Sequence, residues 1–387
     1  MRHAAALLAR HVFAFALSLS CFSTAAAEEA DTSAALDAVF ATIEADAPGC
    51  NVGVIRDGNW THKAGYGMAN MELGVALDGS QVHRMGSVSK QFTALAVLLL
   101  AEEGRIDLQA DIRDYLPALR DYGASVTVNA MLGHFAGMGD YDLIAGSYEG
   151  PIAENAVDLR NAAGGPFRLG NEDYLTIAEF YDVVKRVPLA QEPDQSFRYS
   201  NLAYFLLSML VEEVSGETLR EYADRRIFAP LGMQHTFFSD DPVEIVPNRA
   251  SGYKAIEDGR YVTDMTNLFW VGDGGLHTTL DDMLLWDRSF YAPRVGDHPM
   301  QLLAQMNAPN SQHDARDALY ANGQFVGEVL GQSGFWHSGG WLGTSTYYAR
   351  FPDVRTSLAM MCNDASLDTD ALVEQALAII LGGKYES

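Results

Sequence analysis

A serine and a lysine lie at a spacing that can form a nucleophile and its base. Ser87-Val88-Ser89-Lys90 has the pattern S-x-x-K. A serine hydroxyl is a poor nucleophile until a neighbouring group takes its proton. On a helix, residue i+3 returns to the face of residue i, so the amine of Lys90 can reach the oxygen of Ser87. We therefore interpret Ser87 as a catalytic nucleophile and Lys90 as its proton acceptor.

The segment after Ser87 should hold this pair inside the protein. Residues 88–103 favour a helix and are apolar on nearly every face, and Gly104 ends the run. A helix that is apolar all round lies in the middle of a large domain. Its N-terminus offers free N–H groups to a developing oxyanion, and burial should lower the pKa of the Lys90 amine. Both effects favour nucleophilic chemistry at this serine.

A second copy shows that the S-x-x-K pattern alone is not specific. Ser251 and Lys254 have the same spacing, but residues 252–262, with an Asp-Gly pair at their centre, are typical of a β-hairpin. On a strand, residues i and i+3 point to opposite faces. No helix follows this copy, so we prefer Ser87.

The predicted elements place strands at both ends of the chain and helices between them. Residues from about 115 to 275 look mostly helical and rich in loops. The strand and helix patterns fall as follows: strands over 50–57, 60–68, 335–340, 344–350 and 356–362, and helices over 176–187, 202–214 and 369–381. This order predicts a sheet built from the two ends of the chain, with a helical region inserted into it.

The N-terminus has the parts of a secretory signal peptide. Arg2 and Arg10 give a positive start, residues 12–22 form a short apolar run, and three alanines ending at Ala27 offer a cleavage site. The run is too short to span a bilayer comfortably. We expect cleavage near Ala27 and export to the periplasm or the medium of a bacterium.

The remaining chain is expected to form one catalytic unit over residues 28–387. Residues 28–115 and 275–387 supply an α/β sheet region, and residues 116–274 supply the helical region. The boundaries follow the change from strand-like to helix-like patterns along the chain.

The charge of the chain excludes some partners. The 387 residues carry a formal net charge of −25, which repels phosphate backbones and anionic lipid. After the signal peptide, the sequence contains no run of roughly eighteen apolar residues that could span a membrane. We expect a small-molecule or peptide substrate, no nucleic acid, and neither a metal nor another cofactor. The sequence leaves the oligomeric state open.

Two further motifs follow Ser87 in order. Tyr199 and Asn201 form a Y-x-N at a predicted loop-to-helix junction, and His337 and Gly339 form an H-x-G on a predicted strand. The order S-x-x-K, Y-x-N, H-x-G resembles the penicillin-recognising serine hydrolases: class C β-lactamases, D,D-peptidases, D-aminopeptidases and related esterases. The resemblance covers most of the mature chain.

The resemblance implies a β-lactamase-like α/β (α+β) fold and an acyl-enzyme on Ser87. It implies that Lys90 and Tyr199 share the proton transfers, with Tyr199 relaying a proton to the leaving group. Asn201 would hydrogen-bond either the substrate amide or Lys90. The sequence offers no acidic residue for a separate deacylation base, so Tyr199 and Lys90 would also serve that step.

The same resemblance assigns residues to the substrate side of the site. The backbone N–H groups of Ser87 and Gly340 would form the oxyanion hole. His337 would line the site opposite the tyrosine, with Gly339 beside it. Trp341 is expected either to line the pocket or to pack in the core.

Two other residues match parts of the motifs and are set aside. Tyr320 begins a second Y-x-N, but it comes only shortly before His337 and its Asn-Gly pair is a turn signal. His134 lies outside the three motifs, so we expect it to be structural.

The third motif bears on the substrate. An H-x-G replaces the K-T-G of many β-lactamases, and a neutral imidazole holds a substrate carboxylate less firmly than an ammonium group does. We therefore favour an esterase or peptidase over a dedicated β-lactamase. The alternative function is a penicillin-binding or ligand-sensing module that is acylated without turnover.

The resemblance also bears on the cysteines of the mature chain, Cys50 and Cys362. In this family the first strand pairs with the last in antiparallel fashion, which would bring the two residues near each other. A disulfide between them and two separate buried thiols both remain open.

Overall fold

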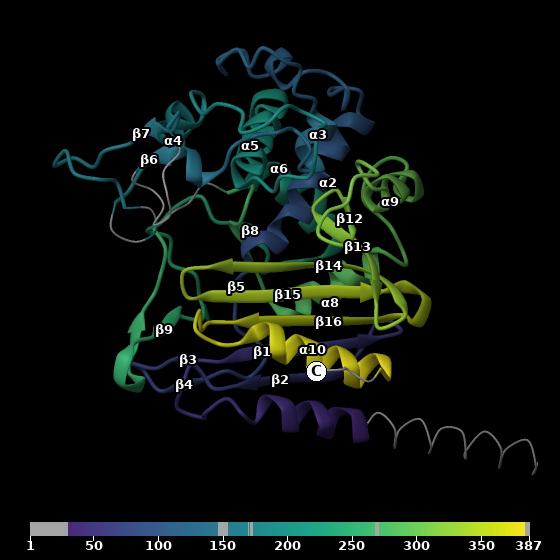
Figure 1. Cartoon of the computed structure of the whole chain (residues 1–387). Coiled ribbons are helices and arrows are strands. Elements are labelled where there is room, and N and C mark those ends of the chain that lie inside the picture. The colour runs from purple at the N-terminus through teal and green to yellow at the C-terminus, as the bar shows by residue number, and fades with distance from the viewer. Residues whose placement is uncertain (1–29, 146–153, 169, 171–172, 268–270, 384–387) are drawn as a thin grey trace, which may run out of the picture.

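The computed structural model describes residues 30–145, 154–168, 170, 173–267 and 271–383 (Figure 1). The expected signal peptide, residues 1–27, lies outside these ranges. Within them, every helix is too short or too polar to cross a bilayer.

A seven-stranded antiparallel sheet is built from both ends of the chain, in the order β12-β13-β14-β15-β16-β1-β2 (Figure 1). This confirms the predicted sheet built from the two ends of the chain. The strands β12 and β13 were not predicted. The bounds are β1 (Cys50–Arg56), β2 (Asn59–Tyr66), β12 (Leu319–Ala321), β13 (Gln324–Val329), β14 (Gln332–Trp341), β15 (Thr344–Phe351) and β16 (Thr356–Cys362).

Helices cover both faces of this sheet. Residues 30–40 and α10 (Thr369–Leu381) pack on one face, and α8 (Leu280–Ser289) packs on the other. Along β16, alternate residues such as Leu358 and Ala359 enter the two different cores. A strand buried on both faces is expected to be apolar throughout, and all seven residues of β16 are buried.

Most of the helices lie in a region beyond the β12–β14 side of the sheet (Figure 1). This region includes α2, which comes from the 28–115 segment and lies beside α5. Every residue from Lys90 to Leu100 of α2 is buried, as its apolar pattern predicts. The helices of this region and the segment that follows it are α2 (Lys90–Glu102), α3 (Val128–Leu132), α4 (Ile177–Val184), α5 (Asn201–Ser215), α6 (Leu219–Ala223), α7 (Ala229–Leu231) and α9 (Pro299–Asn307).

Short strands connect these layers. The predicted hairpin is present as β9 and β10. The three-stranded sheet β5-β11-β8 was not predicted. The bounds are β3 (Met68–Asn70), β4 (Val75–Ala76), β5 (His83–Arg84), β6 (Ile144–Ala145), β7 (Val157–Asp158), β8 (Phe237–Phe238), β9 (Tyr253–Ala255), β10 (Tyr261–Thr263) and β11 (Leu276–Thr278).

The predicted helix over residues 88–103 begins differently from the expectation. A 3₁₀ turn, Gly86–Ser89, precedes α2 and contains Ser87. Gly86 has φ +49°, and a Cβ there would lie 3.1 Å from the backbone nitrogen of Gly340. A Cβ on Gly339 would lie 2.2 Å from the carbonyl oxygen of Met85. Two glycines therefore let β14 lie directly against the turn that carries the serine.

Cys50 and Cys362 form a disulfide. They are opposite each other in the β1–β16 pairing, and their Cα atoms are 3.9 Å apart. The bond is confirmed and the alternative of two separate thiols is wrong. The bond joins the first strand of the sheet to the strand that comes last in the sequence.

Candidate active site

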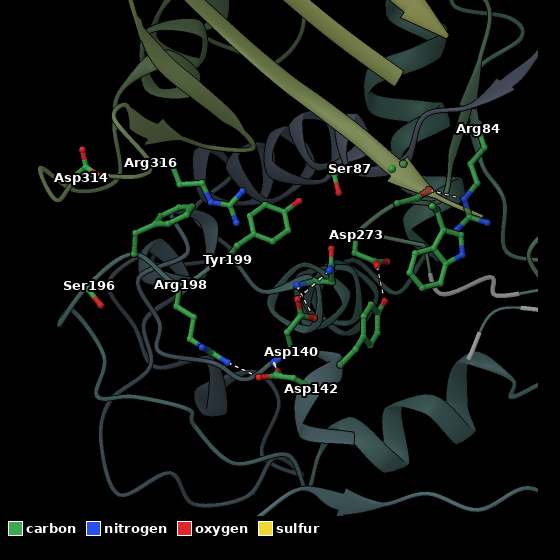
Figure 2. Close-up of a pocket in the computed structure, with 17 residues that line it drawn as sticks. Arg84, Ser87, Asp140, Asp142, Ser196, Arg198, Tyr199, Asp273, Asp314 and Arg316 are labelled. Carbon is green, nitrogen blue, oxygen red and sulfur yellow. Dashed lines mark hydrogen bonds and ion pairs between the residues drawn. The ribbon is translucent and has the colours of Figure 1, made fainter. Parts of the chain in front are cut away.

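A cavity of about 900 Å³ opens where β14, the 3₁₀ turn and the N-terminus of α5 meet. Ser87, Tyr199 and Asn201 lie on its wall, together with Gly340 and Trp341. Figure 2 shows the hydroxyl groups of Ser87 and Tyr199 pointing into the same space. Of the two expectations for Trp341, the structure favours the pocket wall.

The amine of Lys90 is buried beneath Ser87. Its Nζ donates to the Oγ of Ser87 at 3.0 Å, to the Oδ1 of Asn201 at 2.8 Å and to the carbonyl oxygen of Asp273 at 2.7 Å. An ammonium group has three hydrogens, so these acceptors use all of them. Burial lowers the pKa of Lys90 to about 8, although the carboxylates of Asp273 and Asp140 oppose the shift.

These three partners define where a neutral amine would direct its lone pair. Carbonyl and amide oxygens can only accept, so Asn201 and Asp273 retain the two remaining N–H groups of Lys90. The hydroxyl of Ser87 is the one of the three that can donate. Loss of a proton from Lys90 thus leaves the lone pair facing Ser87, an arrangement that can take the serine proton.

Tyr199 reaches the same space from the start of α5. The side chain of Ser200 caps this helix by accepting from the N–H of Ala203, which fixes the chain just after Tyr199. The Nζ of Lys90 lies 4.8 Å from the centre of the Tyr199 ring. Burial raises the pKa of Tyr199 well above its usual range, and nearby Ser87 opposes that shift. The hydroxyl makes no well-aligned hydrogen bond within the described ranges, which leaves it free for a substrate.

Asn201 is held in one orientation by Asp140. The carboxylate of Asp140 accepts from the backbone N–H of Asn201 at 3.2 Å and from its Nδ2 at 3.1 Å. Because a carboxylate only accepts, the amide must turn its Oδ1 toward Lys90. Of the two partners expected for Asn201, the structure therefore shows Lys90. Burial raises the pKa of Asp140 to about 6.

His337 does not line the cavity as expected. Only 2% of it is exposed, and its ring lies behind Tyr199 with the two ring centres 6.0 Å apart. Its Nδ1 donates to the carbonyl oxygen of Ser338 at 2.5 Å, so its Nε2 accepts from the hydroxyl of Tyr320 at 3.0 Å. Burial, with nearby Lys90, lowers the pKa of His337 to about 3, so the imidazole is neutral. Gly339 is likewise absent from the cavity wall, because it packs against the 3₁₀ turn.

Tyr320 and His134 belong to a chain of hydrogen bonds behind the site, in which each group donates to the next. The backbone N–H of Ser200 donates to the Nδ1 of His134 at 3.2 Å, so the Nε2–H of His134 donates to Tyr320 at 3.2 Å. Burial keeps the pKa of His134 well below its usual range. His134 is therefore a structural residue, as expected, and the second Y-x-N supplies a tyrosine to the layer behind Tyr199.

The second S-x-x-K has other partners. Ser251 accepts from the side chain of Asn70 at 3.0 Å. Lys254 is largely exposed and pairs with Asp264 at 3.4 Å. These contacts agree with the preference for Ser87.

Sequence reasoning missed several charged and polar residues of the cavity wall. The structure adds Arg84, Asp140, Tyr141, Asp273 and Arg316 (Figure 2). Asp273 lies between two glycines and the Asp140–Tyr141 pair follows a glycine, so acids beside glycines in an otherwise apolar context are the signal that could have found them.

Comparisons with known proteins agree with this geometry. The model of the Beta-lactamase family matches residues 33–381. The D-aminopeptidase of Gluconobacter oxydans is 27% identical over 357 residues, which cover 92% of this chain and 63% of that protein. Penicillin-binding protein 4* of Bacillus subtilis is 25% identical, with 83% of this chain and 70% of that protein covered. The chain thus spans less than two thirds of the length of the D-aminopeptidase.

Solved structures share the fold. A penicillin-binding protein homologue from Pyrococcus abyssi, described as octameric, has a TM-score of 0.73 at 24% identity, covering 92% of this chain and 78% of that one. The D-amino acid amidase of Ochrobactrum anthropi SV3 has a TM-score of 0.72 at 19% identity, covering 91% of this chain and 99% of that one.

Proposed function

Because this chain belongs to the β-lactamase family of serine hydrolases, we propose that it cleaves an ester or amide through an acyl-enzyme on Ser87. The observation that carries the proposal is the 3.0 Å contact between the buried amine of Lys90 and the Ser87 hydroxyl at the wall of a cavity. A lysine whose pKa is lowered to about 8 is partly neutral near pH 7 and can act as a base.

The proposed reaction has two steps. The Oγ of Ser87 attacks the substrate carbonyl while its proton passes to Lys90, and the oxyanion forms near the N–H groups of Ser87 and Gly340. Tyr199 passes a proton to the leaving group as the ester or amide bond breaks. Water then attacks the acyl-enzyme and gives a proton to the Lys90–Tyr199 pair, and the pair returns a proton to the Oγ of Ser87 as the acid leaves.

The cavity favours a substrate that carries an amine on its acyl side. Asp273 lines the cavity, is 8% exposed, and has one carboxylate oxygen without a hydrogen-bond partner among the described residues. Its other carboxylate oxygen accepts from Tyr141 at 2.9 Å. A substrate ammonium in the cavity would be attracted by the negative charge of this buried carboxylate. The D-aminopeptidase and D-amino acid amidase relatives carry names that imply amino-acid substrates, which agrees with this proposal.

Exchanging Asp273 for asparagine should therefore separate amine recognition from catalysis. Loss of a charged hydrogen bond of about 1.5–3 kcal/mol would lower kcat/KM for D-alanine p-nitroanilide by roughly 10- to 100-fold. p-Nitrophenyl acetate has no amine, so it should share only the part of the loss that comes from the weaker support of Lys90, and the ratio of the two kcat/KM values should fall. We expect the wild type to prefer the free amine over its N-acetylated form. Equal losses on both substrates in Asp273→Asn, or a preference for the acetylated form, would contradict an amine subsite.

We also propose that the protein is exported. The disulfide between Cys50 and Cys362 supports this, because such bonds persist in oxidising compartments and are rare in the cytosol. When the full-length gene is expressed in a bacterium, the intact mass of the product should correspond to a chain that begins near Glu28 and lacks two thiol hydrogens. A mass that retains the first 27 residues would contradict export by cleavage.

The acyl-enzyme is tested by following the intact mass of the mature protein with a fluorophosphonate and with a penicillin. The proposal expects one adduct per chain, stable with the fluorophosphonate and lost again with a substrate ester. A permanent adduct from every acyl donor would instead favour the penicillin-binding module that does not turn over. No adduct with any donor would overturn both functions.

A further inference from the structure

The adjacent residues Asp140 and Tyr141 each bind a residue whose oxygen accepts a hydrogen bond from Lys90. Asp140 accepts from the side chain of Asn201 at 3.1 Å, and Tyr141 donates to the carboxylate of Asp273 at 2.9 Å. Asn201 and Asp273 are the residues whose oxygens accept from Lys90 at 2.8 and 2.7 Å. The dipeptide therefore fixes the amide that accepts from Lys90, and it also holds the side chain of the residue whose backbone carbonyl accepts from Lys90.

The Asp140 contact decides which atom of Asn201 faces the lysine. An amide side chain can rotate so that either its oxygen or its nitrogen points inward. With Asp140 ionised, only the orientation that points Nδ2 at the carboxylate avoids an acceptor facing an acceptor. In the other orientation Nδ2 would face the N–H groups of Lys90, and the amine would lose that partner.

The loop that carries the dipeptide is itself anchored to α5 and the cavity wall. The hydroxyl of Ser200 donates to the carbonyl oxygen of Gly139 at 2.7 Å. Asp142 pairs with Arg198 at 2.8 Å (Figure 2). These contacts flank Asp140 and Tyr141 in sequence, so the dipeptide has little freedom to move relative to Asn201.

We propose that Asp140 and Tyr141 are positioning residues that aim the lone pair of Lys90 at the hydroxyl of Ser87. They do so by holding Asn201 and Asp273, which bind the other two N–H groups of the amine. The inference rests on the proposed function, since it concerns the base of that reaction. It assigns a role to two residues outside the S-x-x-K, Y-x-N and H-x-G motifs.

The pKa of Lys90 depends on the charges around it, so substitutions of those residues should shift this pKa in a known direction. Asp140 and Asp273 raise the pKa of Lys90 against the larger effect of burial. Loss of the Asp140 charge therefore lowers the pKa of Lys90, whereas a loosened site that admits water would raise it. The titratable groups that face Lys90 or share its electrostatic field are Asp140, Asp273, Tyr199, Tyr204, His134 and His337.

The test measures the rate at which a fluorophosphonate labels Ser87, at pH values on both sides of 8. For Asp140→Asn we expect the plateau rate at high pH to fall by roughly 10- to 100-fold, because a misdirected base loses much of its effect. The midpoint of the pH profile should move below that of the wild type. A purely structural role would lower the amount of active protein and leave the plateau rate of the active fraction unchanged.

Tyr141→Phe provides a second variant that keeps the ring in place. The phenyl group retains its packing near Trp341, whose ring centre lies 5.9 Å away. The bond from Tyr141 to the Asp273 carboxylate is charge-assisted, so its loss should lower the plateau by roughly 10-fold or more. Asp121→Asn is the matched control, because it removes an exposed carboxylate paired with Arg113 far from the cavity. It should label like the wild type.

Wild-type rates and midpoints in both Asp140→Asn and Tyr141→Phe would overturn the proposal, and so would an upward midpoint shift in Asp140→Asn. Thermal unfolding of each variant shows whether it is folded, and Tyr141→Phe decides the question should Asp140→Asn not fold. A wild type that is not labelled at Ser87 would contradict the proposed function instead. In that case, ¹⁵N NMR titration of the Lys90 amine in the same variants decides the positioning role on its own.

Discussion

Replacing Ser87 with alanine should abolish covalent labelling and lower kcat/KM for every ester and amide substrate by on the order of 10⁵-fold. The substitution removes the only atom proposed to attack the substrate. It leaves the cavity wall and its hydrogen-bond donors in place. Ser87 is partly exposed, and its Oγ accepts from Lys90, so the fold should tolerate the loss.

The second S-x-x-K supplies the matched control for this experiment. Ser251→Ala removes a hydroxyl with the same motif spacing that contacts Asn70 and not the cavity. It should leave labelling and turnover unchanged. Labelling that survives in Ser87→Ala, or disappears in Ser251→Ala, would show that the nucleophile has been assigned to the wrong serine. Circular dichroism of both variants separates loss of chemistry from loss of fold.

The second largest effect is expected for Lys90→Met. Methionine fills much of the buried volume but cannot take a proton, so kcat/KM should fall by about 10²- to 10⁴-fold, the usual contribution of a general base. Burial has lowered the pKa of Lys90 to about 8, so the amine is charged below that pH and neutral above it. In the wild type, kcat/KM should therefore rise with pH and level off above about 8. This rise should be missing in Lys90→Met.

The control here is Lys254→Met, the lysine of the second motif. Its side chain is 47% exposed, its Nζ pairs with Asp264, and neither residue lines the cavity, so its removal should change neither the rate nor the pH profile of the folded protein. The measurement is kcat/KM for one ester across the pH range, with buffer hydrolysis subtracted. A wild-type profile that is flat around pH 8 would contradict the role of Lys90 as base, as would a Lys90→Met variant that keeps the wild-type rise.

Local patterns explain why much of the fold was predictable from the sequence. Some elements can be recognised from their own residues alone. These are α2, from its apolar run, and β14, β15 and β16, from their β-rich segments. The strands β12 and β13 were missed because they are short, and β13 contains Gly327 and Glu328, which weaken a strand pattern. The short β5-β11-β8 sheet joins segments from three distant parts of the chain, which no local pattern records.

The same limit applies to the candidate site. Ser87, Lys90, Tyr199 and Asn201 carry recognisable spacing, and the structure brings them together. Whether His337 faces the cavity depends on how deeply β14 is covered, so its burial behind Tyr199 could not be inferred from a motif. The contacts of the Asp140–Tyr141 dipeptide depend on how its loop folds against α5.

The two copies of the S-x-x-K motif differ in the partners that their residues contact. Ser251 and Lys254 match the spacing of Ser87 and Lys90. Of the two pairs, only Ser87 and Lys90 are joined by a hydrogen bond, which comes from the buried amine of Lys90. What separates them is the element on which each pair lies. Helix and hairpin patterns, taken together with the motif, favour Ser87 over Ser251 as the nucleophile.

The disulfide has a topological consequence for the site. Cys50 and Cys362 are separated by 312 positions, and their bond closes that whole stretch into a covalent ring that contains the proposed nucleophile, its base and the Asp140–Tyr141 dipeptide. A protease that cuts one exposed point inside the ring, such as the loop where Val243 and Ile245 are 82% and 90% exposed, opens it without dividing the molecule. The two fragments would stay tethered through the adjacent strands β1 and β16. Under oxidising conditions a nicked protein would therefore keep all of its catalytic parts in one molecule.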